Sequence, residues 1–371
     1  MTGPRLSDRQ RLSWLRLIRT PNVGPATFRD LINRFGTADA AIEHLPELTR
    51  SFGSAPPRVP SVSEAEAEMT AAQRCGARFV ALGEADYPSL LRQAEAPPPL
   101  LAIRGEAAVF SLPAAAIVGA RNASVIGCRM ARSLAAGLGE AGYAVISGLA
   151  RGIDTAAHEG SLTTGTVAAL AGGLDRPYPP ENAALCDRIV ERGALVSEMP
   201  FGWEPRAQDF PRRNRLIAGM SLGLVVVEAA RRSGSLISAR LAGEMGRLVF
   251  AVPGSPLDPR AEGANGLLKQ GAILVTDASD VLDALAPLAG RVRHPPPILE
   301  DPPDLSSAPP AEDADRAAVL EAMGPVPTPV DDIVRHTGLH PAQIHLVLLE
   351  LDLAGRLERH PGNMVSLLPP P

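Results

Sequence analysis

The stretch Ala115-Ala-Ile-Val-Gly-Ala-Arg-Asn-Ala-Ser-Val-Ile-Gly127 has a counterpart in Val145-Ile-Ser-Gly-Leu-Ala-Arg-Gly-Ile-Asp154. Each is a short apolar run that ends in glycine and leads into a predicted helix. In a parallel sheet the carboxyl ends of the strands meet at one edge, where ligands bind. A glycine turn at a helix start offers backbone N–H groups and the positive end of the helix dipole, which attract phosphate. Because each turn also carries an arginine, Arg121 and Arg151, the two stretches predict a paired anion site.

Apolar runs alternate with amphipathic helices from about residue 78 to residue 287. The runs are Ala115–Val118, Ala144–Ser147, Thr166–Leu170, Ala194–Ser197, Leu222–Val227, Leu248–Val252 and Ile273–Val275. Most are rich in Val, Ile, Leu and Ala and carry few charges, as expected of strands buried on both faces. The alternation predicts an α/β fold, a Rossmann-like doubly wound parallel sheet over residues 78–290, with Phe79–Leu82 as a candidate edge strand.

The segments that flank this region differ from it in composition. Residues 1–77 predict a small helical domain, in which the turn Pro21–Pro25 between two helical patterns resembles a helix-hairpin-helix, or SAM-like, fold. Such a turn can bind a DNA phosphate through its backbone N–H groups, but many small helical domains share this pattern, which favours packing or protein contact. Residues 291–312 are rich in proline and predict a semi-rigid linker.

Residues 313–371 predict a winged helix, with three helical segments followed by a two-stranded wing. Its candidate recognition helix starts at Pro341 and carries no arginine or lysine up to Gly355. A helix that reads the major groove normally brings basic or amide side chains to its start, where this one has only Gln343 and His345. The pattern therefore favours a protein-contact role over base readout.

Composition limits the class of protein. The chain has 371 residues, 45% of them hydrophobic, and a net charge of −5. The cysteines Cys75, Cys128 and Cys186 form no C-x-x-C pair, which argues against zinc and a disulfide framework. No stretch resembles a signal peptide or a membrane span, so a cytoplasmic protein is expected. Lys269 is the only lysine, which leaves nearly all positive charge on arginine.

Four further segments follow predicted strands, three of them at helix starts. They are Phe210–Ile217 with Arg212, Arg213, Asn214 and Arg215; Glu228–Leu236 with Ser233, Gly234 and Ser235; Gly263–Lys269 with Asn265; and the turn Ala171–Pro180 with Tyr178. Arginines at a helix start oppose the dipole, so their placement favours a nearby anion. A doubly wound sheet brings all these segments to one edge, which predicts a positively charged crevice. Stacking on a base and packing in the core are both open for Tyr178.

Several kinds of chemistry lack their motifs. The sequence contains no G-x-x-x-x-G-K-[ST] loop, and the glycines of the first turn do not follow G-x-G-x-x-G. No Ser-His-Asp or Cys-His set and no carboxylate pair suggests catalysis. We interpret His158 as a residue that orders the second glycine turn by hydrogen bonding, and Asp154 as a helix cap. The sequence thus predicts neither a cofactor nor a metal ion.

A series of motifs in order along about 150 residues resembles the bacterial DNA processing protein A family (DprA, also called Smf). The motifs are Gly119-Ala-Arg121, Ser147-Gly-Leu-Ala-Arg-Gly-Ile-Asp-Thr-Ala-Ala-His158, Tyr178-Pro-Pro-Glu-Asn182, Ser197-Glu-Met-Pro200, Phe210-Pro-Arg-Arg-Asn-Arg215, Ser233-Gly-Ser-Leu-Ile237 and Val252-Pro-Gly254. The resemblance implies a protein that binds single-stranded DNA without sequence preference and is not an enzyme. It also implies protection of incoming DNA during natural transformation, loading of the RecA recombinase, and a homodimer formed through the Rossmann-like domain.

The motifs and the sheet edge together give the expected DNA-binding residues. These are Gly119, Arg121, Ser147, Gly148, Arg151, Gly152, Arg212, Arg213, Asn214, Arg215, Ser233, Gly234, Ser235, Asn265 and Lys269. Tyr178, Phe201, Trp203 and Phe210 are the candidates for base stacking in a chain with only 4% aromatic residues. The resemblance implies lysines in this pocket in several relatives, and arginine would supply the positive charge in this chain.

Two other functions compete with this one. The first is a Rossmann-like nucleoside monophosphate phosphoribohydrolase of the cytokinin-activating type. Such enzymes carry a motif similar to P-G-G-x-G-T-x-x-E at a strand end. The corresponding segment Glu228–Ser235 lacks that motif. The second is a scaffold that recruits partners through its terminal domains, and the retained glycine and arginine turns argue against it.

Overall fold

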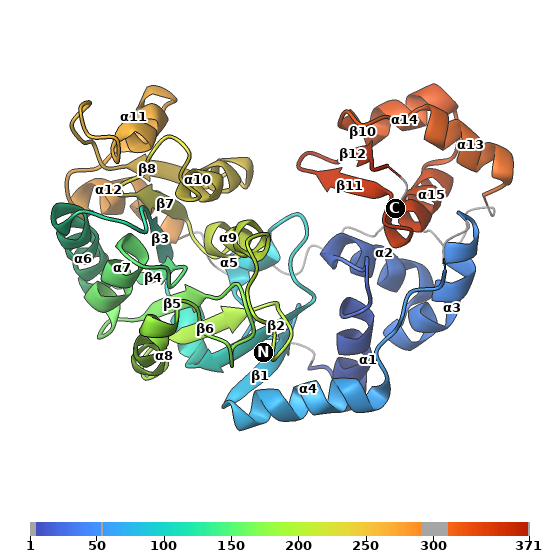
Figure 1. Cartoon of the computed structure of the whole chain (residues 1–371), viewed down its shortest axis with the longest axis horizontal. Coiled ribbons are helices and arrows are strands. Elements are labelled where there is room, and N and C mark those ends of the chain that lie inside the picture. The colour runs from blue at the N-terminus through green and yellow to red at the C-terminus, as the bar shows by residue number, and fades with distance from the viewer. Residues whose placement is uncertain (1–4, 53–54, 291–310, 370–371) are drawn as a thin grey trace. The chain divides into compact units, whose positions relative to one another are not determined.

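The computed structural model describes residues 5–52, 55–290 and 311–369. These residues divide into two compact units (Figure 1). The larger, which we call the sheet unit, comprises mainly residues 68–290, and the smaller, which we call the terminal unit, joins residues 6–67 to residues 311–369. Residues 6–67 and 311–369 thus share one unit, whereas the sequence predicts two separate domains there. Almost all of the predicted proline-rich linker, residues 291–310, lies outside the described residues.

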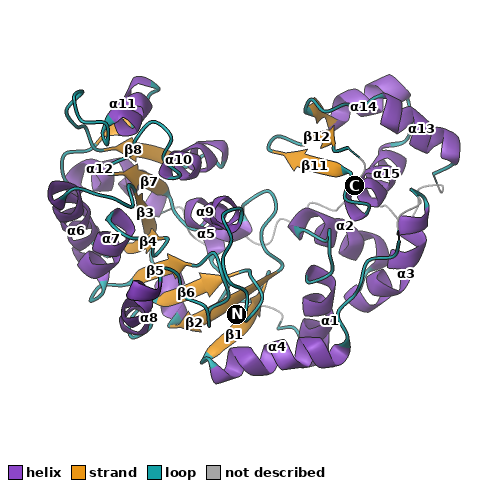
Figure 2. Cartoon of the chain, viewed as in Figure 1, coloured by secondary structure: helices purple, strands orange, loops and turns teal. Residues whose placement is uncertain are grey.

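The sheet unit is built on one nine-stranded sheet in the order β1-β2-β6-β5-β4-β3-β7-β8-β9 (Figure 2). Its strands are β1 (Ala77–Ala81), β2 (Leu100–Gly105), β3 (Ala114–Val118), β4 (Ala144–Ser147), β5 (Thr166–Ala169), β6 (Ala194–Ser197), β7 (Gly223–Val226), β8 (Leu248–Ala251) and β9 (Ile273–Leu274). Strands β3 to β9 are parallel, which confirms the predicted doubly wound sheet. Strand β1 is the expected edge strand, but β2, which pairs antiparallel with β1 and β6, was not predicted.

Helices cover both faces of this sheet (Figure 1). One face carries α6 (Val125–Glu140), α7 (Ile153–Ser161) and α12 (Ala278–Ala289), and the other carries α5 (Ser89–Arg92), α9 (Asp209–Gly219), α10 (Ser235–Glu244) and α11 (Glu262–Lys269). Helix α8 (Ala183–Ile189) lies beside β5 and β6, and α4 (Val62–Arg74) precedes β1. A separate apolar cluster fills the space on each face, as burial of both faces of the strands requires.

The strand order reverses beside β3. Strands β4, β5 and β6 follow β3 on one side, whereas β7, β8 and β9 lie on the other. The loops after β3 and β7 therefore flank the switch point, where an open α/β sheet forms its ligand crevice. Ser124 caps the helix that starts there, because its Oγ accepts a hydrogen bond of 2.8 Å from the Gly127 N–H.

The terminal unit combines helices from both ends of the chain. Its elements are α1 (Asp8–Ile18), α2 (Pro25–Phe35), α3 (Ala38–Arg50), α13 (Asp313–Glu321), β10 (Thr328–Pro329), α14 (Val330–Thr337), α15 (Pro341–Leu353), β11 (Leu357–His360) and β12 (Met364–Leu367). The strands form a small sheet in the order β10-β12-β11, and with the three helices before the wing they confirm the predicted winged helix. Across the described ranges of both units, no helix has the length and apolar character needed to cross a membrane.

Candidate nucleic-acid interface

The two glycine turns pack directly against each other. A Cβ atom on Gly119 would lie 2.6 Å from Ile153 Cγ1, and one on Gly152 would collide with the carbonyl oxygen of Ala120. The Ile153 N–H donates a hydrogen bond of 3.2 Å to that same carbonyl. Gly152 also has a φ of +74°, which side chains rarely tolerate. The sequence prediction that both turns meet at one edge agrees with this packing.

The start of α6 already holds an anionic group from the protein itself. Glu228, which follows β7, accepts hydrogen bonds from the Ser124 N–H at 2.9 Å and from the Ser124 hydroxyl at 2.6 Å. Its carboxylate lies so close to the helix that a Cβ on Gly127 would be 2.5 Å from Glu228 Cδ. The sequence predicts a phosphate at this helix start. In the structure a carboxylate takes that place at the switch point.

The N–H groups of the second turn also point into the protein. Those of Gly148 and Ala150 donate to Asp154 Oδ2 at 3.1 Å and 3.4 Å, and that of Leu149 donates to His158 Nε2 at 3.3 Å. Leu149 has a φ of 60°, in the left-handed region that non-glycine residues seldom occupy. The expectation that these three N–H groups are open to phosphate is therefore wrong, since each has a buried acceptor. The interpretation of His158 as the residue that orders the turn is confirmed.

The hydrogen bonds of His158 define its protonation state. Its Nε2 accepts from Leu149, so the proton of the neutral ring is on Nδ1, which lies 2.8 Å from Thr166 Oγ1. The Thr166 hydroxyl donates to the Val145 carbonyl at 2.8 Å and is free to accept from Nδ1. Complete burial lowers the pKa of His158 to about 3, with a smaller contribution from Arg213. The imidazole therefore stays neutral, because a second ring proton would face the Leu149 N–H.

Arg213, expected among the DNA contacts, lies inside the protein. Its Nη1 donates to the carbonyls of Gly148 and Ala169, the latter at 2.6 Å, and the residue is only 5% exposed. Burial lowers the pKa of Arg213 to about 10 and raises the pKa of the nearby Asp154, and each group opposes the shift of the other. Arg213 is thus still charged at neutral pH and binds the turn from its buried side.

Other predicted residues also bind the protein's own backbone. The Ser147 hydroxyl donates to the Ile117 carbonyl at 2.6 Å, and Asn214 Nδ2 lies 3.5 Å from the Gly234 carbonyl. Asn265 exchanges two hydrogen bonds with Gly254, at 2.9 Å and 3.1 Å, and the hydroxyls of Ser233 and Ser235 lie 2.7 Å apart. These side chains shape the loops at the carboxyl edge of the sheet.

An exposed guanidinium and an exposed tyrosine ring contact the half-buried ring of Phe210 at the same edge. The guanidinium carbon of Arg121 lies 4.8 Å from the ring centre of Phe210, and the Tyr178 ring meets Phe210 edge-on at 5.6 Å. Arg121 is exposed, as is Tyr178 at 46%. We call Arg121, Phe210 and Tyr178 the stacking cluster. Of the other stacking candidates, Phe201 packs edge-on against Phe79 and the Trp203 indole donates to Asp209 at 2.9 Å.

Three more arginines lie at this edge and differ in their ion pairs and in their exposure. Arg151 is exposed and forms an ion pair with the exposed Glu181. Arg212 and Arg215 share the buried carboxylate of Glu198, and the Arg212 Nε to Glu198 distance is 3.0 Å. The Arg212 side chain remains 47% exposed, whereas that of Arg215 is 19% exposed. Two guanidiniums on one carboxylate leave an excess of positive charge, which reaches solvent mainly through Arg212.

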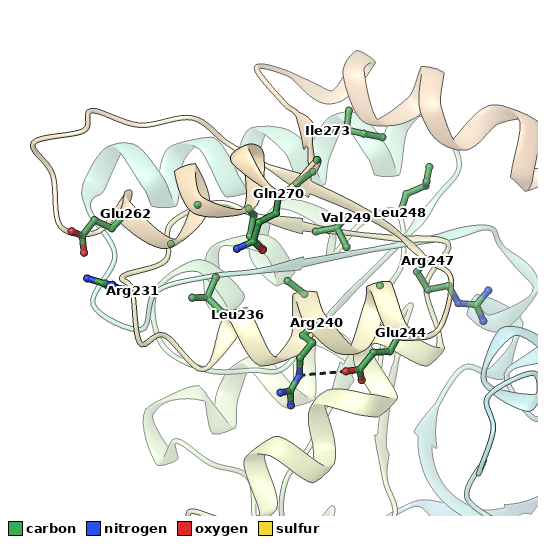
Figure 3. A pocket seen from close by; sticks show the side chains of 17 residues that line it. Arg231, Leu236, Arg240, Glu244, Arg247, Leu248, Val249, Glu262, Gln270 and Ile273 are labelled. Carbon is green, nitrogen blue, oxygen red and sulfur yellow. Dashed lines mark ion pairs between the residues drawn. The ribbon is translucent and has the colours of Figure 1, made fainter. Parts of the chain in front are cut away.

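Lys269 is set apart from these arginines. It is the last residue of α11, so it lies about 10 Å along the helix axis from the N-terminal end of α11. Beside that helix a hollow of about 850 Å³ opens between α10 and α11, next to β8 and β9 (Figure 3). Its lining includes the apolar Leu248, Val249 and Ile273, and none of the predicted DNA-binding residues. The hollow is therefore a different surface from the glycine-turn edge.

The sequence and the fold match known proteins along most of the chain. Residues 78–286 match the sequence model described as DNA recombination-mediator protein A, residues 8–71 the DprA-like N-terminal HHH domain, and residues 302–363 the DprA winged helix domain. Protein Smf of Escherichia coli (strain K12) is 40% identical over 76% of this chain and 75% of its own length. Protein Smf of Synechocystis is 32% identical over 78% of this chain and 80% of its own length.

Two solved structures support this relation. DNA processing protein A from Streptococcus pneumoniae superimposes with a TM-score of 0.63 and 28% identity, over 76% of this chain and 98% of that one. The Helicobacter pylori protein, whose structure concerns its mode of single-stranded DNA binding, gives a TM-score of 0.52 and 27% identity over 57% of this chain and 97% of that one. By its sequence, its domains and its fold, this chain belongs to the DNA recombination-mediator protein A family, DprA/Smf.

Proposed function

We propose that this chain binds single-stranded DNA without reading its sequence, at the edge formed by the glycine turns, in DNA uptake and recombination. Membership of the DprA/Smf family supports this function, as does the single-stranded DNA binding of the H. pylori relative. The stacking cluster is the observation that carries the proposal for this chain. Proteins that bind single strands combine positive charge along the backbone with aromatic faces on which bases stack.

The stacking cluster offers both elements in one place. Arg121 lies over Phe210, while Tyr178 extends the aromatic surface to solvent. A guanidinium plane can stack on a base and also bind phosphate in a bidentate manner. Such contacts leave the hydrogen-bonding edges of bases unread, so they fit any sequence. Arg151 and Arg212, both exposed beside this cluster, are the proposed contacts for the neighbouring phosphates.

Guanidinium groups carry the proposed phosphate contacts, because the backbone donors of the second turn have internal acceptors. This arrangement divides the expected residues of the glycine-turn edge into two groups. Arg121, Arg151 and Arg212 are proposed to touch DNA. Buried members such as Ser147 and Arg213 are proposed to hold the loops that carry these arginines.

The test is the affinity for a fluorescent oligo(dT) across a salt series. Arg121→Gln should lower the slope of log K against log[salt] by about 0.7 to 1, the value of one lost phosphate contact. Phe210→Leu should weaken binding by about 1–3 kcal/mol, the value of one lost base stack. The matched control is Arg192→Gln, since Arg192 is also exposed but precedes β6 and so lies at the opposite edge of the sheet. Equal affinities for the control and the two site variants would refute the proposal.

We further propose that the chain acts as a cytoplasmic homodimer and hands its DNA to the RecA recombinase. The two-residue edge strand β9 and the hollow beside it, which apolar side chains line in part, support the sheet unit as the contact between copies. Sedimentation of the wild type and of Ile273→Arg at several concentrations tests the dimer, and Leu257→Arg, on a side chain that is 93% exposed, is the control. RecA filament formation on protein-bound DNA tests the second step.

We propose that this function involves no catalysis. Glu228, which begins the segment compared with the phosphoribohydrolases, supports this proposal because its carboxylate is engaged by Ser124. Incubation with nucleoside monophosphates should release no free base. Release that disappears in a Glu228→Gln variant would instead support the enzyme.

A further inference from the structure

The helix that a winged helix would use to read DNA is buried on every side. Helix α15 has nine buried residues, among them Leu346, Val347, Leu348 and Leu349, which point in successive directions around it. A helix that is apolar all round belongs in a core and not on a nucleic acid. On one side α15 contacts α13, α14 and β11 of the winged helix, and on the other it contacts α2 and α3 from the N-terminal region.

The two ends of the chain share one apolar core. Side chains of the N-terminal helices and of the winged helix belong to the same cluster of buried residues, which includes Leu17, Phe28, Leu31, Leu45, Ile344, Leu348 and Leu351. Each of these seven residues is at most 3% exposed. Separation of the two parts would expose this surface to water, at a cost of about 25 cal/mol for each Å².

Polar contacts fix the orientation of the two parts at the C-terminal end of α15. Asn22 Nδ2 donates to the carbonyl of Leu353 at 3.0 Å and so satisfies one of the free carbonyls of the helix end. Arg359 of the wing bridges two carboxylates, Asp30 from α2 at 3.0 Å and Asp352 from α15 at 2.8 Å. The Thr27 hydroxyl completes the set with a hydrogen bond of 2.8 Å to Asp352.

A second ionic group is centred on Glu350, two residues before Asp352 in α15. Arg316 of α13 donates two hydrogen bonds, of 2.8 Å and 2.9 Å, to the carboxylate of Glu350, whose side chain is only 3% exposed. The Ser51 hydroxyl from the N-terminal region donates to the same carboxylate at 3.0 Å. Buried charges persist only where they are paired and hydrogen-bonded. The ion pair itself lies within the C-terminal part, and Ser51 adds a hydrogen bond to it from the N-terminal part.

Gln343 of α15 and Arg359 of the wing are already engaged within the terminal unit. Gln343 donates to Asp315 at 3.2 Å and accepts from the His340 N–H at 3.3 Å. Arg359, the arginine of strand β11, is held by its two carboxylates. We propose that the winged helix of this chain is a docking domain for the chain's own N-terminal helices, which close over α15 and exclude it from nucleic acid. This inference is independent of where DNA binds on the sheet unit.

Cleavage of the linker tests the docking. A protease site inserted within residues 291–310 allows the purified full-length protein to be cut after folding. We expect both fragments to elute together from a sizing column at micromolar concentration, with no change in the mass of the complex. Separate elution of the wild-type fragments would overturn the proposal. It would also be overturned if the fragments stayed together only in a dimer of the cut protein.

Variants on the N-terminal side leave the winged helix itself intact. Asp30→Asn combined with Asn22→Ala should speed the dissociation of the cut fragments by about tenfold or more, as expected when a buried charged partner is removed. The matched control is Arg335→Gln, an exposed residue whose ion pair with Asp332 lies within α14. Equal dissociation rates in the variant and the control would count against the docking.

A final measurement asks whether α15 contacts DNA at all. Gln343→Ala and His345→Ala should leave the affinity of the uncut protein for single- and double-stranded oligonucleotides unchanged. A loss of affinity of tenfold or more in either variant, with the fragments still associated, would show that α15 reads DNA and would overturn the proposal.

Discussion

Replacement of Glu228 by alanine tests whether this carboxylate takes the place of a bound phosphate. The change removes the acceptor of two hydrogen bonds from Ser124, at 2.9 Å and 2.6 Å, at the start of α6. Hydrogen bonds to charged groups contribute about 1.5–3 kcal/mol each when buried. Because Glu228 is only partly buried and water can replace part of the interaction, we expect a loss of about 2 kcal/mol in the free energy of unfolding, including about 0.5 kcal/mol from the helix dipole.

Phosphate should restore part of this stability in the variant alone. If the vacated site binds phosphate with a Kd of about 5 mM, about 50 mM phosphate stabilises the protein by about 1.4 kcal/mol. Urea unfolding is measured in phosphate and in chloride at equal ionic strength and pH 7. A Trp14→Phe background leaves Trp203 as the only tryptophan, so its fluorescence reports on the sheet unit.

The control for this prediction is Glu228→Gln, which keeps an acceptor oxygen for Ser124 without the charge. It should lose less stability than the alanine variant and respond less to phosphate. A loss below about 0.5 kcal/mol in the alanine variant would refute the reasoning, since typical surface substitutions fall within that range. An equal response of the wild type and the alanine variant to phosphate would refute it as well.

Three further predictions concern the inner side of the site. The pKa of His158 is lowered from 6.5 to about 3 on folding, so its contribution to stability is complete above pH 6.5 and is lost as the pH falls towards 3. Between pH 7 and pH 5 the wild type should lose about 2 kcal/mol that His158→Gln does not, measured by urea unfolding. Arg213→Lys should weaken oligo(dT) binding about tenfold without lowering the salt slope, whereas Arg121→Gln lowers that slope by about 0.7 to 1. Gly127→Ala should destabilise the wild type by about 1–3 kcal/mol through overpacking but cost less in the Glu228→Ala background, which calorimetry of the four proteins will show.

The sequence predicts the parallel part of the sheet because those strands are buried on both faces. Strands β3 and β7, for example, consist only of apolar residues and glycine, a composition that does not depend on distant partners. Strand β2 was missed because it follows three consecutive prolines, Pro97–Pro99, and ends in Arg104 and Gly105, which together resemble a loop. The shared core of the terminal unit could have been predicted from α15, because the apolar residues of this helix lie on all its sides.

The site could be predicted only as a set of loops at one edge. The glycine spacing and the arginines correctly predict that Gly119, Gly152 and Arg121 lie at the same edge. Whether an N–H group faces solvent depends on which distant side chain lies beneath it, and here the carboxylate of Glu228 comes from a loop more than one hundred residues away from Ser124. Arg213 illustrates the same limit, because its neighbours Arg212 and Arg215 belong to the same helix but differ from it in burial.

The inner hydrogen bonds give the proposed DNA-binding surface a rigid base. Asp154, His158 and Arg213 hold the second turn through its N–H groups and carbonyls, including a Leu149 that keeps a left-handed conformation. A turn held in this way presents Arg151 without paying the entropy of ordering when DNA arrives. The proposed contacts to DNA are then side chains on a rigid base, and none of them needs a particular base edge. Sequence-independent binding with a strong salt dependence is the behaviour that such a surface should have.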